Sequence, residues 1–255
     1  MTRTTMTWTT TTQAAQAAPT ARTTRAALPA STGAALYDPV LARGERLGMA
    51  DRRAALLAGA RGAVLEIGAG TGLNLAHYPT GLEALVLTEP VTPMADRLRA
   101  RVGTSGHLAS VAEVVEARAE DLPFAAATFD TVVSTMVLCT VADVESVLSE
   151  VARVLRPGGK LLVLEHVHAA GTTLGRWQTR LAGPWAVVAG GCRCDRDLLA
   201  AIAARFDVGG IRRAEWTGMP AIVRPLVIGT ATPSRVARHG AWAHHVTAAA
   251  DDARG

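Results

Sequence analysis

The chain of 255 residues is 49% hydrophobic and 19% charged, which provides enough apolar material for one substantial core. Its formal net charge of +4 comes from the ends, because residues 1–33 carry three arginines and no acid (+3) and residues 233–255 carry three arginines against two aspartates (+1), which leaves residues 34–232 neutral. A nucleic-acid-binding domain would carry its basic residues on the folded part, and a membrane-spanning helix needs about 20 apolar residues in a row, so neither nucleic acid nor an integral membrane segment is expected.

Residues 1–33 are rich in Thr and Ala, contain no acidic residue and show no apolar periodicity. This composition predicts a disordered tail, with an organellar transit peptide as the alternative, and it excludes a secretory signal because no apolar stretch is present. We expect one domain over residues 34–232, a flexible tail over residues 233–255, and a cytoplasmic location.

Strand-like and helix-like segments alternate from about residue 38 onward. This pattern predicts an α/β fold, a doubly wound and mostly parallel sheet with helices on both faces. Seven strands are expected, at Ala63–Ile67, Ala84–Thr88, Val111–Ala117, Phe129–Ser134, Lys160–Glu165, near Phe206–Glu215 and near Ile222–Ala231.

Helices are expected between these strands. The clearest is Val141–Leu155, which carries an apolar stripe at helical spacing and is followed by Pro157-Gly158-Gly159, a sequence that ends helices. The other predicted helices are one or two within residues 38–60, one near Asn74–Tyr78, and one over Thr92–Val102.

The strand Ala63–Ile67 leads directly into a turn with Gly68, Gly70 and Gly72. Glycines let the backbone bend sharply and approach a ligand closely, and the following backbone N–H groups can point at that ligand. A dinucleotide fingerprint would place its third glycine at residue 73, which is Leu73, so a nicotinamide cofactor is disfavoured.

Two carboxylates flank this turn. Glu66 would repel a pyrophosphate, but it suits a ligand with a cationic ammonium, such as the methionine end of S-adenosylmethionine. Glu89 follows the second strand at the sheet edge where ligands gather, and it can accept hydrogen bonds from both hydroxyls of a ribose. A solvated strand end is the alternative role for Glu89.

The three cysteines do not have the spacing of a zinc site, because Cys192 and Cys194 are separated by only one residue and no second pair is present. We therefore assign no metal and expect reduced thiols. Cys139 is expected to be a small buried hydrophobe rather than a nucleophile.

Taken together, three motifs resemble those of class I S-adenosylmethionine-dependent methyltransferases of the type 11 group over about residues 36–232. The motifs are the glycine turn, Ala119-Glu120-Asp121-Leu122-Pro123-Phe124 with Phe129-Asp130, and Val154-Leu155-Arg156-Pro157-Gly158-Gly159. A closer similarity is to the mammalian microsomal alkyl-thiol methyltransferases and their bacterial relatives, through residues 135–141, Glu165-His166-Val167, and Trp185 followed by Gly190-Gly191-Cys192 with Arg196-Asp197. The mammalian relatives carry an apolar N-terminal anchor, whereas this chain has a Thr-rich segment there.

The resemblance implies the Rossmann-like methyltransferase fold, S-adenosyl-L-methionine as cofactor, and a set of binding residues. Glu66, Gly68, Gly70 and Gly72 would frame the methionine moiety, and Glu89 would hold the ribose. Ala119 and Glu120 would meet the adenine, and Ser134, Thr135 and Met136 would line the cavity for cofactor and acceptor.

Methyl transfer needs little acid–base machinery, because the main requirement is to align two atoms in a closed apolar pocket. His166 and His168 follow the strand that ends at Glu165, so they could take a proton from an acceptor, although structural roles are equally compatible. The aromatic segment Trp177–Asp197 is interpreted either as a lid over a lipophilic substrate or as a helix packed on the sheet.

We therefore expect methyl transfer to a small lipophilic acceptor, with a thiol as the leading candidate. A quinone or phenol methylated at carbon or oxygen is the alternative enzyme, and a non-catalytic S-adenosylmethionine-binding protein is the alternative from another class. The sequence leaves the acceptor and the oligomeric state open.

Overall fold

A computed structural model describes residues 30–234 of the chain. Most of the two predicted tails therefore lies outside the described residues. At the inner boundary of the first tail, helix α1 (Ala30–Gly44) begins four residues before the predicted domain start at residue 34. The composition of residues 30–33 predicts a tail, but they form the first turn of a helix in which alanine, the best helix former, recurs.

Seven strands form one sheet in the order β3-β2-β1-β4-β5-β7-β6. Strands β1 to β5 run parallel, and β7 is antiparallel to both β5 and β6. The predicted doubly wound, mostly parallel sheet is confirmed. The strands are β1 (Ala63–Ile67), β2 (Ala84–Thr88), β3 (Ala112–Val115), β4 (Phe129–Thr135), β5 (Leu155–His166), β6 (Phe206–Glu215) and β7 (Pro225–Pro233).

The chain reverses its direction of progress across the sheet at β1. This strand pairs with β2 on one side, where Leu65 is opposite Val86, and with β4 on the other, where Leu65 is opposite Val132. Open α/β sheets bind ligands at the carboxyl ends of the strands at such a switch point. The topology therefore indicates a ligand-binding site at the end of β1, where the predicted glycine turn lies.

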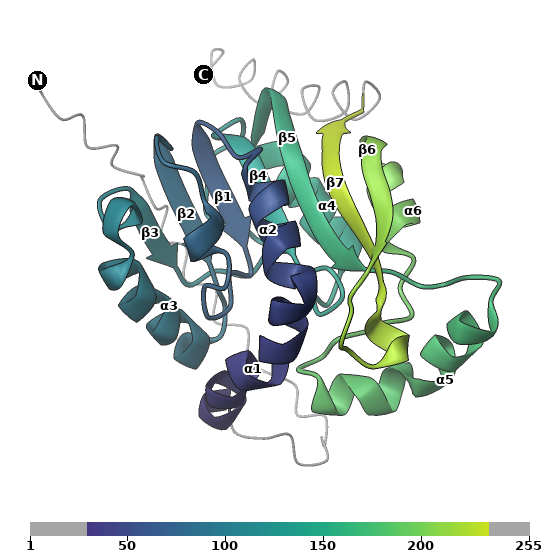
Figure 1. The fold of residues 1–255 in the computed structure, drawn as a ribbon. Coiled ribbons are helices and arrows are strands. Elements are labelled where there is room, and N and C mark those ends of the chain that lie inside the picture. The colour runs from purple at the N-terminus through teal and green to yellow at the C-terminus, as the bar shows by residue number, and fades with distance from the viewer. Residues whose placement is uncertain (1–29, 235–255) are drawn as a thin grey trace, which may run out of the picture.

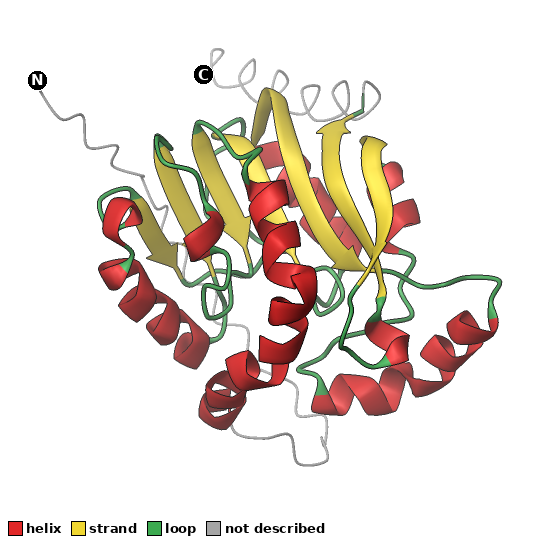
Figure 2. Ribbon diagram, in the orientation of Figure 1, coloured by secondary structure: helices red, strands yellow, loops and turns green. Residues whose placement is uncertain are grey.

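Helices cover both faces of the sheet (Figures 1 and 2). Helices α1, α2 (Ala50–Leu57) and α3 (Thr92–Thr104) pack on one face, and α4 (Val144–Val154) and α6 (Leu198–Ala203) pack on the other. Two apolar layers result, because successive side chains of a strand point to opposite faces.

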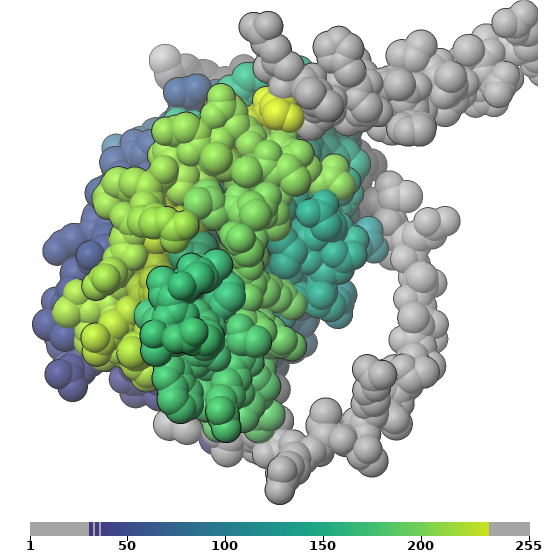
Figure 3. Space-filling model, turned by 90° about the vertical axis from the view of Figure 1, so that its right-hand side faces the viewer, coloured from purple at the N-terminus to yellow at the C-terminus, as the bar shows by residue number. Residues whose placement is uncertain are grey.

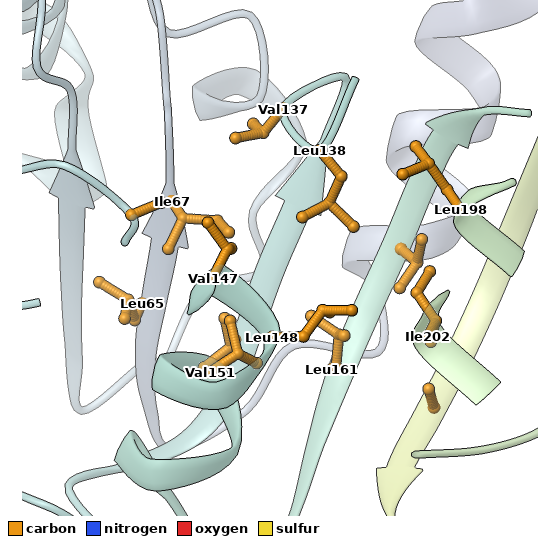
Figure 4. Packing of buried hydrophobic residues seen from close by; sticks show 14 of the residues in the cluster. Leu65, Ile67, Val137, Leu138, Val147, Leu148, Val151, Leu161, Leu198 and Ile202 are labelled. Carbon is orange, nitrogen blue, oxygen red and sulfur yellow. The ribbon is translucent and has the colours of Figure 1, made fainter. Parts of the chain in front are cut away.

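Every residue of β1 is buried, as expected for a central parallel strand. Leu65 and Ile67 face α4, whose Val147, Leu148 and Val151 are fully buried against them (Figure 4). Each fully buried aliphatic side chain contributes about 1.5–3 kcal/mol of transfer free energy to folding. The rigid core thus ends directly beneath the glycine turn.

Helix α5 (Thr173–Val188) lies at the edge of the molecule where the parallel strands end, and it does not cover a face of the sheet (Figures 1 and 3). It contacts the short turn η4 (Ala221–Val223) that precedes β7. Between the two interpretations of this segment, the position of α5 favours a lid at the sheet edge.

Several boundaries differ from prediction. Helix α4 begins at Val144 instead of residue 141, because the Asp143 side chain accepts hydrogen bonds from the backbone N–H groups of Glu145 and Ser146 and caps the helix there. The helix expected near Asn74–Tyr78 is only one 3₁₀ turn, η2 (Leu75–His77). Within residues 30–234, no helix is both long and apolar enough to cross a bilayer.

Candidate active site

The glycine turn after β1 has a backbone that only glycine adopts easily. Gly68, Gly70 and Gly72 have φ angles of +56°, +59° and +88°. A Cβ atom at Gly68 would lie 2.8 Å from Val137, and one at Gly72 would lie 2.8 Å from two leucine side chains. At Gly70 the nearest atom is Cε1 of Tyr37, 4.0 Å away, so this glycine alone faces open space.

That open space is a small cavity at the switch point of the sheet. It is bordered by the glycine turn, by α1 and α2, and by the end of β4. Its lining residues are Tyr37, Arg53, Glu66, Gly68, Ala69, Gly70, Leu73, Asn74 and Thr135.

Glu66 is the acidic group of this cavity, and it is only 2% exposed. Its carboxylate accepts hydrogen bonds from Asn74 Nδ2 at 2.8 Å and from the Tyr78 hydroxyl at 2.6 Å. Burial raises the pKa of Glu66 to about 7, while these hydrogen bonds and the nearby Arg53 oppose the rise. A cation placed in the cavity would favour the ionised form of this carboxylate.

Arg53 is the basic group of the cavity and is 3% exposed. Its guanidinium donates to Asn74 Oδ1 at 2.9 Å and to Thr135 Oγ1 at 3.3 Å, and it forms an ion pair with Glu45 at 3.2 Å. Asn74 thus links Arg53 to Glu66. The cavity thus holds one guanidinium and one carboxyl group, which matches the carboxylate and ammonium of an amino-acid moiety.

Glu89 lies immediately after β2 and is 6% exposed. One carboxylate oxygen accepts from the backbone N–H of Gly70 and the other from that of Val91, both at 2.9 Å. Burial raises the pKa of Glu89, and the two backbone hydrogen bonds oppose this shift. Because a carboxylate has about four acceptor positions, Glu89 can still accept from two hydroxyls.

Ala119 and Glu120 do not line this cavity. Ala119 is buried in the core on the α4 face. Glu120 accepts a hydrogen bond from the backbone N–H of Ala142 at 2.9 Å and forms an ion pair with Arg118 at 3.3 Å. Their contact with adenine stays a prediction.

The three residues at the end of β4 take different environments. Thr135 lines the cavity, whereas Ser134 is fully buried and donates to Glu165 Oε1 at 2.6 Å. Met136 has a φ of +61°, which is strained for a residue other than glycine and is typical of functional segments. Of the three, only Thr135 contacts this cavity.

The two histidines predicted as bases lie at the end of β5. His166 is 6% exposed and stacks on Trp216, and burial lowers its pKa to about 4. His168 is partly exposed and is tied to α5, because its Nε2 lies 3.0 Å from the Gly175 carbonyl oxygen and 3.3 Å from the Thr179 hydroxyl. His168 therefore has the better access to an acceptor.

Helix α5 is attached to the strand ends through Gln178, which is fully buried. Its Nε2 donates to the carbonyl oxygens of Val167 and Ile222 at 3.1 and 2.9 Å, and its Oε1 accepts from the backbone N–H of Ala169 at 2.7 Å. These bonds fix the position of the helix next to β5 and η4.

Sequence reasoning missed three cavity residues with polar side chains, Tyr37, Arg53 and Asn74. None of them belongs to a local motif, and each reaches the cavity only through the packing of α1, α2 and η2 on the sheet. Arg53 had a detectable signal, because it shares the buried side of its helix with Leu56 and Leu57. A charged residue at such a position usually has a specific partner.

The donor set fits S-adenosylmethionine, the cofactor expected from the sequence. The open face at Gly70 is a cradle that a Cβ would narrow, Glu66 matches an ammonium, and Arg53 matches a carboxylate. Glu89 stands at the end of β2, adjacent to the turn, where ribose hydroxyls are recognised in this class of sheet.

Comparisons with known proteins point in the same direction. A family model described as a methyltransferase domain matches residues 65–163. Human thiol S-methyltransferase TMT1A is 34% identical over 170 residues, which cover 66% of this chain and 69% of that protein. Human thiol S-methyltransferase TMT1B is 38% identical over 145 residues, and the chain spans only 59% of its length.

Solved structures share the fold at low sequence identity. A methyltransferase from Thermotoga maritima, described as a possible histamine N-methyltransferase, has a TM-score of 0.58 at 20% identity and covers 80% of this chain and 98% of its own. Geranyl diphosphate C-methyltransferase from Streptomyces coelicolor, solved with S-adenosyl-L-homocysteine, has a TM-score of 0.55 at 14% identity, covering 72% of this chain and 77% of its own.

Proposed function

Because the chain belongs to the S-adenosylmethionine-dependent methyltransferases, we propose that it transfers a methyl group to the thiol of a small lipophilic molecule. The observation that carries this acceptor is the similarity to thiol S-methyltransferase TMT1A. That similarity extends over 170 residues, which is longer than the stretch 65–163 matched by the family model.

The cofactor, when bound, supplies a methyl group on a positively charged sulfur. Under the proposal, Glu66 contacts its ammonium, Arg53 its carboxylate, and Glu89 its ribose. Gly68, Gly70 and Gly72 shape the turn that lets the ligand approach the backbone. Ala119 and Glu120 contact the adenine, and the chain at Ser134, Thr135 and Met136 forms the wall between cofactor and acceptor, with Thr135 lining the cavity.

The reaction forms one carbon–sulfur bond and breaks another. With the cofactor held by Glu66, Arg53 and Glu89, the acceptor sulfur would take the methyl group, the electrons of the broken bond would remain on the donor sulfur, and the acceptor proton would leave to a base or to water. Thiols have pKa values around 8.5, so part of the acceptor is already a thiolate near neutral pH. The protein therefore acts mainly by aligning the two sulfurs and excluding water.

His168 is the candidate base for that proton, because it is partly exposed at the end of β5 beside α5. His166 is less suited, since a pKa of about 4 makes it a weak proton acceptor. Apolar side chains on α5, among them Trp177 with 51% exposure and Val188 with 76% exposure, suit a lipophilic acceptor near this edge.

The deciding experiment is a methyl-transfer assay with S-adenosylmethionine and three acceptor series of matched size: alkyl thiols, phenols and quinols. We expect methylated product from the thiols, with KM falling as the alkyl chain lengthens. Turnover only of phenols or quinols would replace the acceptor with the alternative named above. Binding of the cofactor with no turnover on any series would contradict an enzymatic role.

A further inference from the structure

A cluster of metal-ligating side chains lies beside the cofactor cavity and is unused by the proposed reaction. Cys139 follows β4, His166 ends β5, and Cys192 follows α5, yet one ligand atom from each lies within 4.8 Å of the other two. The exposed fractions are 1%, 6% and 7%, so water is largely excluded. Three segments far apart in sequence thus converge on one buried point.

Polar atoms around this point are unsatisfied. His166 Nδ1 and Glu165 Oε2 are buried, and neither has a hydrogen-bond partner among the described residues. The Cys139 thiol is in hydrogen-bond contact with the Cys192 thiol, and its contact with the Met136 carbonyl oxygen is long, at 3.7 Å. Buried polar groups are normally paired, so unpaired groups around a ligand cluster call for an ion.

The chemistry of the two cysteines and the histidine indicates which metal ion would bind here. Thiolate and imidazole are the preferred ligands of Zn²⁺, and two thiolates cancel its charge, which lowers the cost of burying it. In a tetrahedral zinc site the ligand atoms stand about 3.3–3.8 Å apart. Separations of at most 4.8 Å reach this geometry by small side-chain rotations.

We propose that Cys139, His166 and Cys192 bind one Zn²⁺ ion, with the fourth position held by water or by an external ligand. The ion joins the ends of β4 and β5 to the segment after α5. It therefore attaches the chain after α5 to the sheet, in addition to the attachment through Gln178. This proposal does not depend on the identity of the methyl acceptor.

The site adjoins the cofactor cavity. Cys139 lies three residues beyond Met136, and Val137 packs against the position where Gly68 would carry a Cβ. The metal site therefore lies next to the glycine turn that borders the cavity.

The test measures metal in the full-length protein. The protein is purified with a reductant and without chelators, and zinc is quantified by elemental mass spectrometry in wild type, Cys139→Ser, Cys192→Ser and Cys194→Ser. Cys194 is the matched control, because it is equally buried and two residues from Cys192 but outside the cluster. We expect about one zinc per chain in wild type and Cys194→Ser, and at least a tenfold loss in the other two variants.

A second measurement covers the case in which the variants fail to fold. Wild-type protein is stripped with a chelator and titrated with Co²⁺, and a thiolate-to-cobalt charge-transfer band saturating at one equivalent is expected, together with a rise in Tm. A stripped wild type that gives neither band nor Tm shift overturns the proposal. So does zinc content unchanged in Cys192→Ser, or a Cys139–Cys192 disulfide found by mass spectrometry in place of metal.

Discussion

At the scale of single residues, the three glycines of the turn show a division of roles between core packing and ligand access. Gly68 and Gly72 are needed for packing, because a Cβ at either would meet neighbouring side chains at 2.8 Å. Gly70 faces the cavity, so a side chain there would take ligand space without disturbing the core. The sequence predicted the turn and its ligand, but not this division, which depends on what packs around each glycine.

Gly70→Val tests that division. A branched side chain at Gly70 fills the cavity mouth, so we expect at least a 100-fold loss of S-adenosylmethionine affinity in titration calorimetry, about 3 kcal/mol. The control is Gly81→Val, which shares the strained positive φ (+86° against +59°) but has no atom of residues 30–234 within 4 Å of its Cβ position. Equal cofactor affinity in the two variants would contradict the placement of the ligand at Gly70.

Glu66 gives cofactor binding a pH dependence. Its pKa of about 7 lies above the ordinary value of 4.5, and a bound ammonium requires the ionised form. We therefore expect S-adenosylmethionine affinity to weaken as the pH falls from about 8 to about 6, and Glu66→Gln to bind more weakly with a flatter pH profile. Glu83→Gln, at an exposed acid, should behave like wild type.

The same group affects stability with the opposite sign. Because the folded state holds the Glu66 proton more tightly than the unfolded state, the contribution of Glu66 to stability falls as the pH rises from 4.5 to about 7. In the absence of cofactor, the Tm of Glu66→Gln relative to wild type should therefore increase over this interval. A Tm difference independent of pH would show that Glu66 titrates normally.

At the scale of elements, α2 carries a charged residue on its buried side. Arg53 satisfies Asn74, Thr135 and Glu45 at once, so the helix is positioned by polar contacts as well as by its leucines. The Arg53 guanidinium therefore helps to position α2 and is also a candidate group for binding the cofactor.

Arg53→Met keeps the apolar stem and removes the charge. We expect an unfolding free energy lower by about 2 kcal/mol, because buried partners lose their donor, and at least a tenfold loss of cofactor affinity. Arg52→Met is the control, since among the described residues the Arg52 guanidinium bonds only to the carbonyl oxygen of nearby Gly48. Cofactor binding by Arg53→Met equal to that of the control would remove Arg53 from the site.

Helix α5 depends on Gln178 for its attachment. Gln178→Leu leaves two carbonyls and one N–H without partners, so we expect a loss of about 2–3 kcal/mol in unfolding free energy. If α5 covers the acceptor, KM for the acceptor should rise severalfold while the Kd for the cofactor changes less than about twofold. Arg176→Ala, at an exposed position of the same helix, should change neither. A KM unchanged in Gln178→Leu would argue against a lid.

Element boundaries show what local patterns can and cannot determine. β1 and β2 have the predicted bounds, because runs of buried apolar residues are local signals. β6 also has the predicted bounds, although most of its residues are exposed or half-buried. β5 begins at Leu155, not at Lys160, although Pro157-Gly158-Gly159 reads as a helix stop. Pairing of Phe129 with Leu155 brings this segment into the sheet, and such pairing is invisible in a single sequence.

At the scale of the whole molecule, strand order assembles the site. The predicted residues Glu66, Gly70 and Glu89 meet because β1 and β2 are neighbours at the switch point, as the alternation of strands and helices implies. The cysteine and histidine cluster could not be predicted, because its members come from segments whose spacing has no zinc pattern and which only the fold brings together.

The central claim is that the turn at the end of β1 binds S-adenosylmethionine. A crystal structure of the protein with this cofactor at saturating concentration tests it most directly. The account predicts the methionine end in the cavity between Gly70 and Arg53, with its ammonium within hydrogen-bond distance of Glu66 and its ribose at Glu89. A cofactor bound at another place, or electron density absent from this cavity at saturation, would contradict it.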